Sequence, residues 1–73
     1  MKNRIELITL TDVKEFVDAA MSIDGDVYLV DNKGKYRVSA KSIIGVLLSQ
    51  SEWASTYVES EVDCYNTFNK WIV

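Results

Sequence analysis

The fold of this chain is decided by the stretch Ala40-Lys41-Ser42-Ile43-Ile44-Gly45-Val46-Leu47-Leu48. It predicts a short apolar helix over residues 42–48, which follows small and polar residues and contains a glycine. Gly45 costs about 1 kcal/mol relative to alanine inside a helix, so this helix needs tertiary packing to be stable. A core-facing stripe uses about three apolar residues in two turns, whereas four large aliphatic residues fall within six positions here. We therefore expect part of its apolar surface to face outward.

The composition predicts one small globular domain that covers residues 1–73. Hydrophobic residues make up 48% of the chain and charged residues 26%, which is typical of a folded protein and not of a disordered one. The net charge is −3 and the eight basic residues are scattered along the sequence, so we expect no nucleic-acid partner. The apolar runs are shorter than the roughly 20 residues of a membrane span, and the first residues do not resemble a signal peptide. We expect no membrane segment and a cytoplasmic location.

Several residue types that carry chemistry are missing. The chain has no histidine, the commonest general base and metal ligand. Cys64 is the only cysteine, so it is expected to be a small residue near the core and not part of a disulfide or a metal cluster. Asp24, Asp26 and Asp31 lack the spacing of a calcium loop and are expected to form turns. We expect no enzyme activity, no metal and no cofactor.

Periodicity of the apolar residues predicts four strands and three helices. Strands are expected over 3–10, 27–30, 35–40 and 55–59, with Tyr36, Val38 and Ala40 facing inward. A first helix is expected after Thr11 as its N-cap, with this apolar face: Val13, Phe16, Val17, Ala20 and Ile23. Residues 49–52 are expected to form a polar loop that carries Trp53. Ser60 and Asp63 predict a capping box for a last helix whose apolar positions are Val62, Tyr65, Phe68, Trp71 and Ile72.

The order of these elements, βαββαβα, predicts the α+β class. Three helices and four short strands favour a two-layer open-faced sandwich, with the helices on one face of a mostly antiparallel sheet.

In this order the chain resembles a bacterial family, the histidine-containing phosphocarrier proteins (HPr) of the sugar phosphotransferase system. The strongest match is Lys41 to Leu47, which is similar to that family's Lys-Ser-Ile-Met-Gly-Val-Met/Leu helix entry. Residues 26–29 and the pair Gly34-Lys35 also lie where the family has similar residues. The resemblance implies a sheet with the strand order 1-4-2-3.

The site of phosphoryl transfer departs from the family pattern. The family's phosphoryl-accepting histidine lies between the first strand and the first helix, but the matching stretch here, Thr9-Leu10-Thr11-Asp12-Val13, has no histidine, arginine or proline. A phosphate ester on Thr9 or Thr11 would be too stable to pass on. Asp12 adds a negative charge where a helix N-terminus would otherwise attract phosphate. We expect a degenerate phosphoryl site at Thr9, Thr11 and Asp12.

Ser42 matches the family's regulatory serine, which implies phosphorylation by a dedicated kinase. A helix N-terminus with Lys41 beside it suits a phosphate group on physical grounds. The simpler interpretation is that Ser42 only caps the helix, as serines commonly do.

The resemblance also implies that the 42–48 helix docks protein partners. Spacing alone assigns Ile43 and Val46 to the core and leaves Ile44 and Leu47 more exposed. The expected partner-binding residues are Ile43, Ile44, Leu47, Leu48 and Trp53. The alternative is that the four aliphatic residues all belong to the core and that Trp53 covers the core edge.

Together these observations predict a non-catalytic regulatory or protein-interaction module of HPr-like type that docks through the 42–48 helix. Phosphotransferase-system or transcription-regulator proteins are the partners that the resemblance implies. Two alternatives stay open: a divergent phosphocarrier with another acceptor residue, and a structural domain that forms a homodimer. The chain is expected to be a monomer or a weak homodimer.

Overall fold

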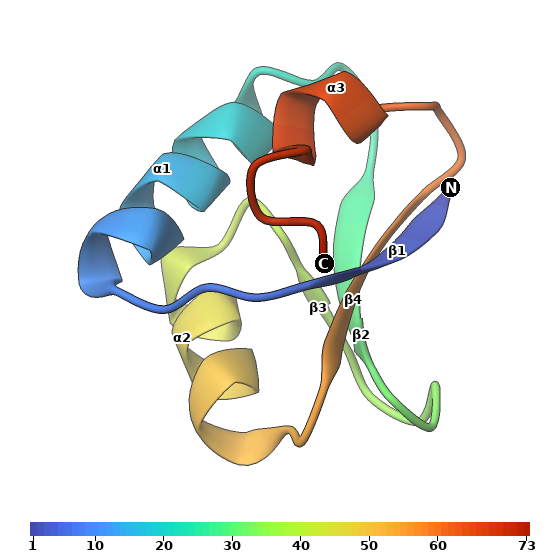
Figure 1. The fold of residues 1–73 in the computed structure, drawn as a ribbon. Coiled ribbons are helices and arrows are strands. Elements are labelled where there is room, and N and C mark those ends of the chain that lie inside the picture. Colours follow the sequence, from blue (N-terminus) through green and yellow to red (C-terminus); the bar gives the residue numbers. More distant parts are fainter.

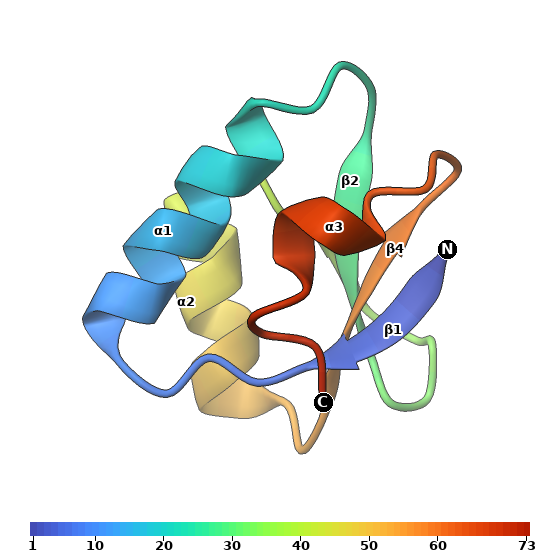
Figure 2. The same ribbon diagram turned by 45° about the horizontal axis from the view of Figure 1, so that its top comes forward.

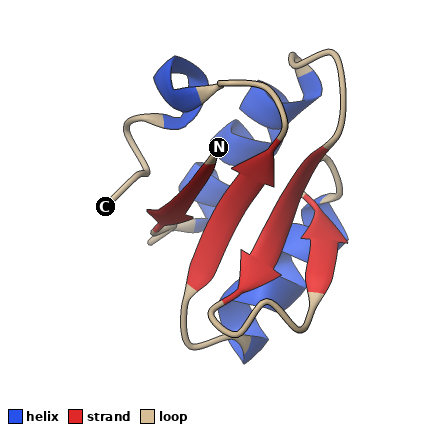
Figure 3. Ribbon diagram, turned by 90° about the vertical axis from the view of Figure 1, so that its right-hand side faces the viewer, coloured by secondary structure: helices blue, strands red, loops and turns tan.

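The computed structural model describes residues 1–73, which form one sheet with three helices on one of its faces (Figures 1 and 3). The elements in chain order are β1 (Lys2–Ile5), α1 (Leu10–Met21), β2 (Val27–Asp31), β3 (Arg37–Ser39), α2 (Ile43–Glu52), β4 (Thr56–Ser60) and α3 (Tyr65–Phe68). The sheet is antiparallel and has the order β1-β4-β2-β3. The predicted α+β open-faced sandwich with strand order 1-4-2-3 is therefore confirmed.

The register of the central strands decides which residues reach the core. Val58 of β4 pairs with Leu29 of β2, and Leu29 pairs with Val38 of β3. Because successive side chains of a strand point to opposite faces, this row lies under the helices, where Val58 and Leu29 are fully buried. Tyr28 and Tyr57 belong to the alternate rows and lie on the face that no helix covers, which Figure 3 turns toward the viewer.

Within the helical layer, Phe16, Phe68 and Trp71 form an aromatic cluster. The rings of Phe16 and Phe68 lie 4.8 Å apart between centroids, and the ring of Trp71 meets Phe16 edge-on at 5.5 Å. All three side chains are buried, so the cluster joins α1 to α3 and to the end of the chain. Figure 2 shows α1 and α3 on the same side of the sheet. α1 is the longest helix, with 12 residues, and no helix here has the length and apolar character that crossing a bilayer requires.

The start of α1 differs from the prediction. β1 ends at Ile5 and α1 begins at Leu10, so the N-cap is Thr9 and not Thr11. Ile8 and Leu10, whose alternation favoured a longer strand, are 80% and 63% exposed. The capping box explains the change, because Thr9 and Asp12 satisfy each other's backbone N–H groups.

The third strand is shorter than predicted, and Tyr36 does not face inward. Tyr36 is 56% exposed, because the Asp31 carboxylate accepts the backbone N–H groups of Lys35 and Tyr36 and holds both residues in the hairpin loop. Val38 is half-buried and Ala40 fully buried, as predicted.

The predicted polar loop over 49–52 is wrong, because α2 continues through Glu52. Ser49 is fully buried and its hydroxyl donates to the carbonyl of Val46 at 2.7 Å. A serine that bonds back to its own helix satisfies its hydroxyl without leaving the helix. The polar residues therefore extend α2 by one turn.

The predicted start of the last helix is also wrong. Ser60 ends β4, and its hydroxyl donates to the carbonyl of Asp26 and accepts the N–H of Val62. α3 begins at Tyr65 with Cys64 at the N-cap position and no side-chain cap. Val62 and Tyr65 are exposed, whereas Phe68 and Trp71 are buried as predicted. Cys64 is buried near the core as predicted, but just before the helix.

Candidate functional site

The N-terminal end of α1 carries a capping box formed by Thr9 and Asp12. The Asp12 carboxylate accepts the backbone N–H of Ile8 at 3.0 Å and that of Thr9 at 3.1 Å. The Thr9 hydroxyl accepts the N–H of Asp12 at 3.1 Å. Thr11 lies in the first turn and is exposed. The structure therefore brings Thr9 and Asp12 together and leaves Thr11 apart.

The Asp12 carboxylate is negatively charged at this end of α1. The backbone N–H of Ile8, and then that of Thr9, lower the pKa of Asp12 below its ordinary value. The indole N–H of Trp71 lowers this pKa further, although its geometry falls short of a hydrogen bond and leaves that buried nitrogen without a partner. An ionised carboxylate thus occupies the place where a helix terminus would hold an anion.

Ser42 caps α2. Its hydroxyl oxygen accepts the N–H of Gly45 at 3.2 Å, and the residue is exposed. Lys41 does not lie ready for a phosphate group, because its ammonium donates to the carbonyl of Ile23 at 2.8 Å. The capping role is what the structure contains, and phosphorylation of Ser42 stays a prediction.

The outer side of α2 is apolar and exposed. Ile44 is 76% exposed, Leu48 50%, and Ile43 and Leu47 42% each. Exposed Ile44 and Leu47 and buried Val46 follow the spacing prediction, but the assignment of Ile43 to the core is wrong. We call the surface formed by Ile43, Ile44, Leu47, Leu48 and Ser51 the α2 face.

Gly45 explains why α2 turns this side outward. A β-carbon at Gly45 would lie 3.2 Å from the β-carbon of Val38, so the helix backbone rests directly on β3 at that point. Val46 and Ser49 then face the core and are fully buried, while Ile43 is turned to the rim. The glycine that looked unfavourable in the sequence permits this close contact with the sheet.

Trp53 is separate from the α2 face. It forms the C-cap of α2, with its backbone N–H bonded to the carbonyl of Ser49, and its side chain is half-buried against the core. This position fits the alternative in which Trp53 covers the core edge.

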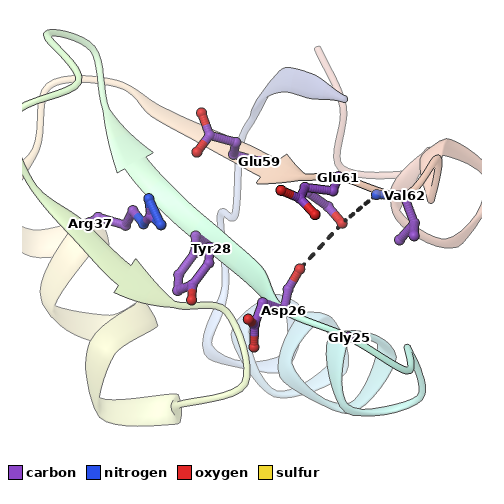
Figure 4. Close-up of a pocket in the computed structure, with 8 residues that line it drawn as sticks. Gly25, Asp26, Tyr28, Arg37, Glu59, Glu61 and Val62 are labelled. Carbon is purple, nitrogen blue, oxygen red and sulfur yellow. Dashed lines mark hydrogen bonds between the residues drawn. The ribbon is translucent and has the colours of Figure 1, made fainter.

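A hollow of about 520 Å³ lies at one end of the uncovered sheet face (Figure 4). It is lined by Gly25, Asp26, Tyr28, Arg37, Glu59, Ser60, Glu61 and Val62. The Arg37 guanidinium lies 4.0 Å from the centre of the Tyr28 ring, and the hydroxyl of Ser60 is already bonded to backbone groups. The hollow places no nucleophile beside a base.

Sequence reasoning missed this hollow, and it missed that three cationic side chains lie on the same face of the sheet. The lining residues come from three strands and two loops, so no linear motif marks them. Lys2, Arg4 and Arg37 share the uncovered sheet face, where Lys2 lies 5.6 Å from the centre of the Tyr57 ring. Strand alternation was the one signal that could have placed them together.

Comparison with known proteins finds no match: no family model, no curated protein and no solved structure is similar to this chain. The function proposed below therefore draws on the chain's own residues and on the sequence resemblance described above.

Proposed function

We propose that this chain is an HPr-like, non-catalytic interaction module that binds another protein through the α2 face. The observation that carries the proposal is the exposure of four large aliphatic side chains, 42–76% each, on one helix of a small domain. Single exposed apolar residues are ordinary, but a contiguous apolar patch on the order of a few hundred Å² is typical of an interaction site.

The composition of the α2 face supports binding to protein. Residues 43–51 include no charged residue, and the centres of protein interfaces are depleted in charge. Burying an exposed aliphatic side chain completely contributes about 1.5–3 kcal/mol. Covering the exposed parts of these four side chains would therefore contribute favourably to the free energy of binding a partner. The α2 face is therefore better suited to an apolar protein surface than to a charged ligand.

The N-terminal end of α1 supports the non-catalytic part of the proposal. An incoming phosphate would meet the negative charge of the Asp12 carboxylate, which the N–H groups of Ile8 and Thr9 hold at this end of α1. Phosphorylation of the Thr9 hydroxyl would also disturb its hydrogen bond with the N–H of Asp12, which caps α1. These contacts support a proposal without carrier chemistry at this end of α1.

Ser42 offers a means of regulation within this proposal. It lies next to Ile43 at the end of the α2 face and is exposed. A phosphate group there would add about two negative charges beside an apolar surface. Phosphorylation would then weaken the docking of an apolar partner. Phosphotransferase-system and transcription-regulator proteins are the partner classes that the sequence resemblance suggests.

The proposal is tested by placing a photo-crosslinking amino acid at position 47 in the chain expressed in its own cells. A matched probe at position 18, on the exposed side of α1, serves as the control. We expect a discrete crosslinked protein from position 47 only, and its loss when Ile44→Asp is added. Equal products from both positions, or none from either, would contradict the proposal.

A further inference from the structure

The α2 face can be laid against a second copy of itself about a twofold axis. A twofold contact pairs residue i with j and j with i, so a helix that meets a second copy must be complementary to itself. Ile44 and Ser51 are seven residues apart, about two turns, and share one side of α2 with Leu47 and Leu48 between them. A twofold axis between Leu47 and Leu48 puts Ile44 of each copy over Ser51 of the other, and Leu47 over Leu48. A large side chain then meets a small one on either side of the paired leucines, and Ile43 at the rim lies beside the partner's Glu52.

The one polar side chain of the α2 face, Ser51, can be buried without losing its hydrogen bond. Burying a hydroxyl costs free energy when it has no hydrogen-bond partner, but the Ser51 hydroxyl already donates to the carbonyl of Leu48 at 3.1 Å. Covering Ser51 with an apolar side chain therefore leaves its hydrogen bond in place.

The charges at the two ends of α2 favour an antiparallel pair. Lys41 precedes the helix and Glu52 ends it, while the first turn has no acidic residue. In an antiparallel pair each Glu52 lies at the partner's helix N-terminus, where the macrodipole is positive and an acid is stabilising. A parallel pair would bring like ends together.

From these three observations we infer that the occupant of the α2 face is a second copy of this chain, bound with its α2 antiparallel to the first. The inference rests on the proposed function and names the partner for the same surface. The α2 face covers on the order of a few hundred Å², less than the roughly 800 Å² per partner of a standard interface. The dimer is therefore weak, with a dissociation constant on the order of 10–1,000 µM.

Sedimentation equilibrium from about 1 µM to about 1 mM covers the range over which such a dimer forms. Wild-type chain is expected to pass from monomer to dimer, and Ile44→Asp to bind itself at least about 30-fold more weakly, the loss typical of a central contact residue. Met21→Lys, which changes an exposed apolar residue of α1, should dimerise as wild type does. The new acid lies in the first turn of α2 and the new base in the last turn of α1, where the helix dipole favours each charge. Circular dichroism verifies that both variants fold. A wild-type chain that stays monomeric, or equal weakening by both substitutions, would overturn the inference.

A charge reversal tests the antiparallel arrangement. Glu52→Lys should weaken dimerisation by about 3- to 10-fold at low salt, with the effect shrinking at high salt because charge interactions are screened. Asp18→Lys makes the same charge change on the exposed side of α1 and should not weaken the dimer. Unchanged dimerisation of Glu52→Lys would show that the antiparallel contact is wrong.

The crosslinking experiment separates this inference from the proposed function. A product from position 47 with twice the mass of the chain supports the homodimer. A product that contains a different protein, and no homodimer, keeps the proposed function and overturns the homodimer. The absence of any product overturns both.

Discussion

The helices α1 and α2 lie on the same face of the sheet but use their apolar residues in opposite ways. α1 buries Val13, Phe16, Val17 and Ala20, whereas α2 buries only Val46 and Ser49 and leaves its four large aliphatic residues exposed. α1 alternates its apolar stripe with charged residues, so one side suits the core and the other suits water. α2 is apolar on both sides, and the core covers only one of them. Hydrophobic composition alone therefore does not show which helix lies deepest.

The two helices also begin differently. α1 has a reciprocal cap between Thr9 and Asp12, while α2 has a single bond from the Gly45 N–H to Ser42. The start of α1 carries a carboxylate, and the start of α2 is an exposed serine beside an apolar surface.

The largest difference between the helices is expected from truncating one residue in each. Phe16→Ala should lower the free energy of unfolding by about 3–5 kcal/mol, because it removes the centre of the aromatic cluster and leaves a cavity. Ile44→Ala should change it by about 0.5 kcal/mol or less, since its side chain is mostly in water. Urea unfolding at low protein concentration measures both. Similar losses in the two variants would mean that α2 is packed as deeply as α1.

The caps should differ by a smaller amount. Thr9→Ala should cost about 1–2 kcal/mol, because it breaks one bond of a reciprocal pair, and Ser42→Ala about 0.5–1 kcal/mol. Urea unfolding of both variants gives the comparison. A larger loss at Ser42 than at Thr9 would contradict the view that α1 begins with the stronger cap.

Gly45→Ala tests the close contact between α2 and the sheet. Alanine gains about 1 kcal/mol in helix propensity, but its methyl group would lie 3.2 Å from the β-carbon of Val38 and crowd the contact, at a cost of about 1–3 kcal/mol. We expect a net loss of about 1 kcal/mol. Ser51→Ala, on the outer side of the same helix, should instead gain a few tenths of a kcal/mol. Stabilisation by both substitutions would show that the glycine is not needed for packing.

Acid should weaken the start of α1 but not that of α2. The pKa of Asp12 is lowered by the N–H groups of Ile8 and Thr9, and that of Asp31 by the N–H groups of Tyr36 and Lys35. Both ordinary values are 3.8. The stability that each lowered pKa contributes is fully present above that value and is lost as the pH falls through the folded-state pKa. Urea midpoints between about pH 7 and pH 3 should fall at the acid end, and less steeply in Asp12→Asn. An unchanged slope would exclude a contribution from Asp12.

The sequence predicts the parts of this fold that depend on local pattern. The buried stripe of α1 follows from spacing, and the sandwich follows from the order of elements. The strand order came from the resemblance and not from the residues themselves. The start of α1 was missed because Thr9 and Thr11 both suit an N-cap, and only the bond with Asp12 decides between them. The last turn of α2 was missed because burial of Ser49 depends on contacts that are distant in sequence.

In the candidate site, too, local spacing predicts some features, while others depend on contacts between residues that are distant in sequence. Spacing predicted that Val46 faces the core and that Ile44 and Leu47 are more exposed, and the structure confirms this. Ile43 was assigned to the core in error, because the contact of Gly45 with Val38 sets which side of α2 faces the sheet. The residues around the hollow come together only through strand pairing.

The aromatic cluster has a practical consequence for observing this molecule. Trp71 lies within it, against Phe16, while Trp53 sits half-buried at the far end of α2. A chain with Trp53→Phe would report through fluorescence on the integrity of the interior alone. A chain with Trp71→Phe would report on events near the end of α2, so each tryptophan can serve as a built-in optical sensor for a different process.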